Sequence, residues 1–157
     1  MRLLKMTLTF LCCYLIALQS FAYTPSDEPI TFEDLPLTTQ TFIQEQFAHM
    51  TVTRASYNTQ DCLKCYEVHL SDNTTLRFDD MGNWCAIERV DSEVPTALIP
   101  ERIQQTLNDR FAGIGIYKLE KDTNSIKVGL ANKEELVFNT DFQLLDFEDD
   151  TSNVIEE

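Results

Sequence analysis

One stretch of the chain, residues 66–84, constrains the fold most, because it has the pattern of two strands separated by tight turns. Apolar and polar residues alternate over residues 66–70 and again over 76–78, which is the period of a strand with one buried face. Turn-forming residues lie between these runs and again before Trp84. The stretch therefore predicts antiparallel strands with one buried and one open face.

This pattern occurs twice. Four apolar positions recur 60 residues later, so that Val68, Leu70, Leu76 and Phe78 match Val128, Leu130, Leu136 and Phe138. Before each copy, apolar residues spaced by four predict an amphipathic helix, and each helix begins next to a proline, Pro36 or Pro100. We therefore predict two copies of one unit, each with a helix and a four-stranded meander.

The predicted fold class is α+β, with two tandem helix-plus-four-stranded antiparallel meander repeats and the helices packed on one face of the sheets. A repeat this short buries little core, so the two copies should share a core or join their sheets. We assign the first repeat to residues 34–91 and the second to residues 92–150. Residues 23–33 are predicted to be a loose leader and residues 151–157 an acidic tail.

The first 22 residues have the features of a signal peptide. Arg2 and Lys5 form a short basic start, an apolar run follows, and small residues precede Tyr23. The apolar run is too short for a membrane-spanning helix. The residues before Cys12 and Cys13 are not the small ones that usually precede a lipid anchor, so we do not expect a lipoprotein. We expect a periplasmic or secreted protein that is not embedded in a membrane.

Acidic residues outnumber basic ones by 26 to 12, and the formal net charge is −14. Nucleic acid is excluded as a partner, because binding its phosphates requires basic patches. A basic protein, a cationic peptide or a divalent cation would complement this charge. The same charge is also typical of an exported protein that is simply soluble.

Three cysteines follow the signal peptide, and an oxidising compartment favours one disulfide with one thiol left over. We predict a local bridge between Cys62 and Cys65, with Cys62–Cys85 as the alternative. A redox role for the C-x-x-C pair is a weaker alternative, because the second cysteine leads into a strand and not into a helix that would lower its pKa. Cys62, Cys65, Cys85 and His69 could supply four zinc ligands. Only one C-x-x-C pair is present, however, and the usual second pair of closely spaced ligands is missing, so we predict no metal site.

No catalytic motif is present, because the chain has no nucleophile elbow, HExxH sequence, phosphate loop or dinucleotide fingerprint. Residues 79–83 lack the alternating ligands of a calcium loop, and we predict a β-turn there with Gly82 at positive φ. We therefore predict no enzyme and no cofactor.

Alternation along the strands assigns residues to the open face of the sheet. If the apolar residues point toward the helices, their neighbours point toward solvent or a partner. We predict that the partner-binding face contains Glu67, His69, Arg77, Asp79, Ile87, Lys127, Val137 and Phe147. An apolar centre with charged surroundings is typical of an interface, and a solvated sheet surface can have the same pattern. The prediction is a non-catalytic exported binding module for a protein or peptide; the alternative is a sensor or carrier for a small ligand or divalent cation.

The order of motifs resembles a known family. The motifs are an L/I-P-x helix ending in Phe, a Y-E-V-x-L strand, a T-x-L-x-F-D strand and a D-x-x-G-x-W turn. They resemble the PepSY-like, β-lactamase-inhibitor-like exported proteins of Bacteroides-type bacteria, over nearly all of residues 35–150. The resemblance implies an inhibitor-like binding module without an active site. In the second copy Phe142 replaces Gly82 and Leu144 replaces Trp84, so equal roles for the two halves do not follow.

Overall fold

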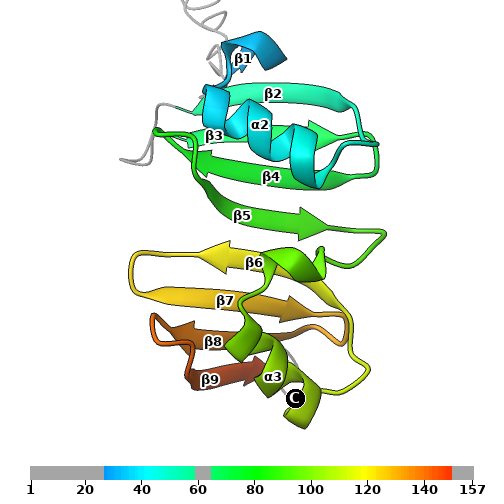
Figure 1. Cartoon of the computed structure of the whole chain (residues 1–157), viewed down its shortest axis with the longest axis vertical. Helices are drawn as coiled ribbons and strands as arrows, with labels where there is room; N and C mark the ends of the chain where they lie inside the picture. Colours follow the sequence, from blue (N-terminus) through cyan, green and yellow to red (C-terminus); the bar gives the residue numbers. More distant parts are fainter. Residues whose placement is uncertain (1–26, 59–64, 150–157) are drawn as a thin grey trace, which may run out of the picture.

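A computed structural model describes residues 27–58 and 65–149 of the chain. These residues form one sheet of nine antiparallel strands, and each strand pairs with the next one along the chain (Figure 1). The strands are β1 (Asp27–Ile30), β2 (Val52–Asn58), β3 (Cys65–Leu70), β4 (Thr74–Asp79), β5 (Trp84–Arg89), β6 (Ile116–Lys121), β7 (Ser125–Leu130), β8 (Glu134–Asn139) and β9 (Leu144–Asp149). The helices among these residues are α2 (Leu37–Gln46) and α3 (Glu101–Arg110), with short 3₁₀ helices η1 (Phe32–Asp34) and η2 (Thr96–Leu98). The predicted α+β class with antiparallel strands is confirmed.

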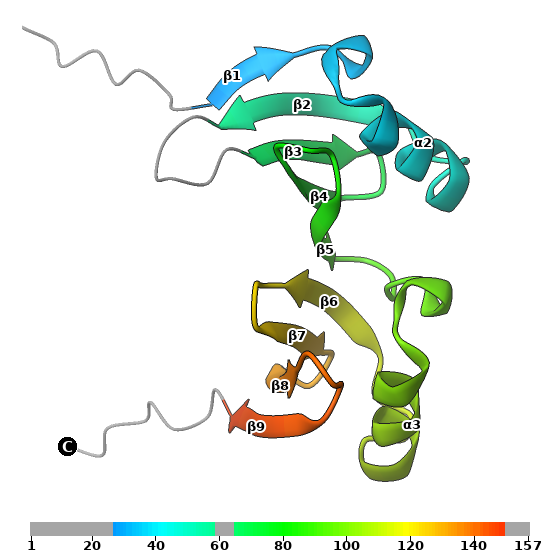
Figure 2. The same ribbon diagram turned by 60° about the vertical axis from the view of Figure 1, so that its left-hand side comes forward.

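Both helices pack on the same face of the sheet (Figure 2). α2 lies over the half that contains β2–β5, and α3 lies over the half that contains β6–β9. Apolar residues from the helices and from the facing side of the strands form one core, which includes Ile43, Ile103, Val68, Leu76, Phe78, Val128, Leu136 and Phe138. None of the described helices is long and apolar enough to cross a membrane.

The ends of both helices follow from local sequence. Pro36 and Pro100 are the N-cap residues of α2 and α3, a place where no intrahelical N–H is lost. The amide Nε2 of Gln40 donates to the Leu35 carbonyl at 2.9 Å, and that of Gln104 donates to the Ile99 carbonyl at 2.7 Å. Each glutamine therefore ties its helix to the segment that leads into it.

One prediction was wrong at the start of the fold. We expected residues 23–33 to be a loose leader, but Asp27–Ile30 form β1, which pairs with β2. The edge of β2 offers unpaired backbone groups that an added strand can satisfy, and Pro29 is tolerated because β1 is an edge strand. The predicted signal peptide (1–22) and acidic tail (151–157) lie outside the described residues.

A β-bulge in β5 explains a second wrong prediction. Arg77 of β4 pairs with Ala86, whereas the next residue of β4 pairs with Trp84, so Cys85 is the extra residue of the bulge. The bulge breaks the alternation along β5. Ile87, which we placed on the open face together with Cys85, is 0% exposed and belongs to the core.

The pairing of β8 with β9 shifts register in the same way, after Val137. Phe147, which we also predicted on the open face, pairs with the core residue Leu136. The side chain of Phe147 lies outside the described part of the chain.

Candidate functional site

The face of the sheet opposite the helices, called the open face below, is the candidate site. No element within residues 27–58 and 65–149 crosses it (Figure 2). In β3, β4, β7 and β8, buried core residues alternate with partly exposed ones, and the partly exposed set belongs to the open face. The predicted residues found there are Glu67, His69, Arg77, Asp79, Lys127 and Val137.

A band of ion pairs runs across the open face from β4 to β8. Arg77 and Lys118 both contact the Glu120 carboxylate, at 3.5 and 3.0 Å. Lys118 and Lys127 both contact the Glu135 carboxylate, at 3.5 and 3.7 Å. Burial alone would lower the pKa of Lys118, but the two carboxylates outweigh it and raise that pKa. The band holds these long charged side chains in defined positions on the sheet.

His69 is held between two partners on the same face. Its Nε2 lies 2.9 Å from the Glu67 carboxylate, and its Nδ1 lies 3.1 Å from the Thr75 hydroxyl. In the neutral ring, the carboxylate favours the proton on Nε2, so that Nδ1 accepts a hydrogen bond from the Thr75 hydroxyl. The imidazole therefore has a defined orientation at the surface.

A hollow of about 450 Å³ lies on the open face, near the end of β4, the start of β5 and the end of β6. Ala86 lies between two long side chains, because it pairs with Arg77 on one side and with Glu120 on the other. The small side chain of Ala86 leaves depth between these neighbours. We call this site the Ala86 hollow, and the lining residues used below are Arg77, Asp79, Cys85, Ala86, Glu120, Lys121, Asp122 and Thr123.

Asp79, which lines this hollow, is the first residue of the turn 79–83. The Asp79 carboxylate accepts hydrogen bonds from the backbone N–H groups of Met81 and Asn83, at 3.0 and 2.8 Å, and from the Asn83 amide at 3.1 Å. Gly82 has φ +85°, and a Cβ there would lie 2.7 Å from Pro36 Cβ. The predicted β-turn with Gly82 at positive φ is confirmed.

The sequence alone did not reveal Lys118, Glu120 or Asp122 as site residues. They belong to β6 and to the turn after it, and they reach this site because β6 pairs with β5. That pairing joins the two halves of the chain and has no local sequence signal. Thr75 was missed as well, although its alternation with Leu76 placed it on the open face.

Among the described residues, no three His, Cys, Asp or Glu side chains are grouped so that they could hold a metal ion. Cys62 lies outside the described residues, so the Cys62–Cys65 disulfide stays a prediction. Cys85 carries a free thiol, and its burial raises its pKa.

We expect Cys85 to react slowly with iodoacetamide. The thiolate is the reactive form, and a raised pKa leaves less of it at pH 7.5. Peptide mapping by mass spectrometry should show Cys85 alkylated at least tenfold more slowly in the native protein than in urea. Equal rates in the two states would contradict the burial of this thiol.

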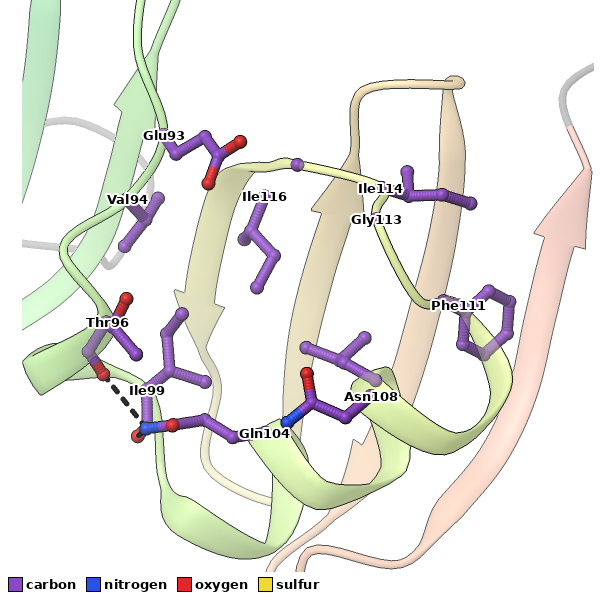
Figure 3. Close-up of a pocket in the computed structure, with 12 residues that line it drawn as sticks. Glu93, Val94, Thr96, Ile99, Gln104, Asn108, Phe111, Gly113, Ile114 and Ile116 are labelled. Carbon is purple, nitrogen blue, oxygen red and sulfur yellow. Dashed lines mark hydrogen bonds between the residues drawn. The ribbon is translucent and has the colours of Figure 1, made fainter.

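A second hollow, of about 320 Å³, lies on the helix side between α3 and the segment that leads into β6 (Figure 3). One of its polar groups, the Gln104 amide, has its partners within the fold, since Nε2 also donates to the Thr96 carbonyl at 3.0 Å. A Cβ on Gly115 would lie 2.6 Å from a Glu93 carboxylate oxygen, so the glycine makes room for that side chain. A similar hollow beside α2 is lined by Phe47 and Met50. We therefore interpret both hollows as features of how the helices pack on the sheet.

The described residues thus define an α+β protein with an open antiparallel sheet, helices on one face only and a charged, hollowed opposite face. A family model described as "Putative beta-lactamase-inhibitor-like, PepSY-like" matches residues 64–146. The chain belongs to this PepSY-like, β-lactamase-inhibitor-like family, as its motifs predicted.

Solved structures with the same fold come from Bacteroides. A "putative calcium-regulated periplasmic protein" of Bacteroides thetaiotaomicron is 31% identical with a TM-score of 0.76, and the match covers 78% of this chain and 97% of that one. A "putative periplasmic protein" of Bacteroides vulgatus is 30% identical with a TM-score of 0.76, covering 80% and 99%. A "putative periplasmic protein of unknown function" from Bacteroides vulgatus is 24% identical with a TM-score of 0.75, covering 78% and 99%, and supports the fold alone. No curated protein matches the chain.

Proposed function

We propose that the chain is a non-catalytic periplasmic binding module that holds a protein or peptide on its open face. One observation carries the proposal: the sheet buries its core under helices on one face, and no described element covers the other. The inhibitor-like description of the family agrees with protein binding, and the two similar structures at 30% identity or more are both described as periplasmic.

The chemistry of the open face supports this use. The ion pairs from Arg77 to Lys127 orient long side chains in advance, which reduces the conformational entropy lost on binding. Val137 and Ala86 provide apolar surface between the charged side chains. The net charge of −14 favours a partner with a basic surface.

We also infer that the chain consists of two copies of one unit. α2 and α3 each end at a phenylalanine with nearly the same backbone angles, φ −133° and ψ 36° at Phe47 and φ −131° and ψ 32° at Phe111. The register of β3 with β4 recurs 60 residues later in β7 with β8, and a register shift follows in both halves. The charges on the open face differ between the halves, which supports different roles for them.

A charge swap on the open face tests the proposed function. The double variant Glu67→Lys and Lys127→Glu keeps the net charge, so any loss of binding reports the pattern of charges on this face. We expect it to capture at least tenfold less partner from periplasmic extract than the parent. The control variant, Glu45→Lys and Arg102→Glu, makes the same swap at exposed helix positions and should capture as well as the parent. If the open-face variant captures as much partner as the control variant and the parent, with unchanged melting temperatures, the open face is excluded as the binding surface.

A second candidate function is a response to calcium, favoured by the description of the similar Bacteroides thetaiotaomicron protein as calcium-regulated. Sites in extracellular modules bind calcium with Kd values of about 0.1–1 mM. Bound calcium would therefore stabilise the fold, by about 1.4 kcal/mol at tenfold excess over Kd. An unchanged melting temperature at millimolar calcium in a calorimeter would dismiss this candidate.

A further inference from the structure

We propose that the Ala86 hollow receives a single lysine or arginine side chain of the partner. This inference rests on the proposed function, because it assigns one contact of the same open face. The site combines an apolar floor with an acidic rim, and a long cationic side chain has the matching chemistry: an apolar stem and a charged end.

The floor of the hollow is formed by Ala86 and Cys85. Ala86 is buried, and its methyl group lies outside the main core, on the opposite face of the sheet from the helices. Cys85 is the bulged residue next to it and is half-buried. A methylene chain that lies on these two side chains would remove apolar surface from water without burying a charge.

The charges around the rim do not balance. The Glu120 carboxylate is already shared by Arg77 and Lys118. Lys121 also lines the hollow. Its ammonium lies 3.4 Å from the centroid of the Trp84 ring, which stacks on Phe42 of α2, so its charge is directed to the helix side of the sheet.

Among the described residues, two carboxylates of the rim therefore have no cation partner. Within the part of the chain that the structure describes, the Asp79 carboxylate accepts hydrogen bonds only from neutral groups of its own turn, and Asp122 accepts one from the Thr123 N–H at 2.6 Å. Within residues 27–58 and 65–149, no lysine or arginine forms an ion pair with either carboxylate. A cation bound between them would find a negative potential that the protein itself does not neutralise.

The negative charge of Asp79 is not required by the turn that contains it. The corresponding turn between β8 and β9 is built on Asn139, whose Oδ1 accepts from the N–H groups of Asp141 and Gln143, at 3.0 and 2.9 Å. Its amide also contacts the Gln143 side chain at 3.1 Å. The two backbone hydrogen bonds of the turn are thus accepted equally well by a neutral side chain, so the charge at Asp79 is available for a ligand.

N-acetyl-arginine amide and its neutral isostere N-acetyl-citrulline amide are the probes for this site. Amide chemical shifts of the full chain are followed by NMR while each probe is added to millimolar concentration. We expect the arginine compound to shift the amides of Cys85, Ala86 and Thr123, with an affinity at least fivefold above that of the citrulline compound. In the variant Asp79→Asn and Asp122→Asn, that preference should fall below twofold.

The matched control removes two carboxylates elsewhere, in the variant Asp109→Asn and Asp141→Asn, and should keep the preference for arginine. An equal loss in both variants would show attraction to the overall charge only, and shifts outside the hollow would place the cation elsewhere; either result overturns the inference. The proposed function is judged separately, because its charge swap at Glu67 and Lys127 leaves the lining of the hollow unchanged. If the charge swap abolishes capture but the parent shows no preference for the arginine compound, the cation site in the Ala86 hollow is rejected and the binding role of the open face is retained.

Discussion

Replacement of Phe78 by alanine is expected to lower the free energy of unfolding by about 3–5 kcal/mol. Phe78 lies in β4, is fully buried, and packs edge-to-face against Phe42 of α2 with ring centroids 5.7 Å apart. The substitution removes this contact and leaves a cavity between the sheet and the helix. The loss is a large part of the stability of an ordinary domain, so the variant should unfold at much lower urea concentration.

Leu37→Ala is the control for this prediction. Leu37 lies in the first turn of α2 but is 78% exposed, so its replacement should change the free energy of unfolding by no more than about 0.5 kcal/mol. A change below 1 kcal/mol for Phe78→Ala in urea denaturation would show that α2 does not pack on β4 as described.

Replacement of Arg89 by alanine should lower the free energy of unfolding by about 2–3 kcal/mol, because it leaves a partly buried carboxylate without its cation. The Arg89 guanidinium donates to the Asp72 carboxylate at 2.7 Å, to the Glu93 carbonyl at 2.7 Å and to the Thr74 hydroxyl at 3.1 Å. The side chains of Arg89 and Asp72 are only 11% and 19% exposed. These bonds connect β5 to the turn before β4 and to the segment that leads into η2.

The same ion pair predicts a pH dependence. Burial alone would raise the pKa of Asp72, but hydrogen bonds from Thr74 and Arg89 and the charge of Arg89 outweigh it and hold that pKa below its ordinary value of 3.8. The unfolded chain therefore binds the proton more readily than the folded one. The contribution of Asp72 to stability is fully present above pH 3.8 and is lost as the pH falls through its lowered value in the folded state.

Asp72→Asn isolates this effect. Asparagine can still accept the turn hydrogen bond from the Thr74 N–H, as Asn132 accepts the one from Glu134 at the same distance of 3.2 Å. The variant should be less stable than the parent at pH 7, and the difference should shrink below pH 3.8 in urea denaturation. A difference that stays constant down to pH 2 would contradict the role of the Asp72–Arg89 pair.

Local patterning predicted much of the open face. Alternation placed Glu67, His69 and Arg77 correctly, because each lies in a strand without a bulge between it and the apolar residues that set the phase. Ile87 was misplaced because one extra residue, Cys85, reverses the phase for the rest of β5. No residue type marks that insertion in the sequence, since both faces of β5 carry small or apolar side chains there.

The order of apolar and polar residues was enough to establish the strands β2–β9, the two helices, the antiparallel class and the family, because these depend on contacts between residues close together in the chain. Folding in three dimensions decided the rest: β1 was added at one edge, the bulge reassigned Ile87 to the core, and the pairing of β5 with β6 brought Glu120 beside Arg77. Strand register and neighbours across the sheet depend on hydrogen bonds between distant segments, and the periodicity of a single strand contains no information about them.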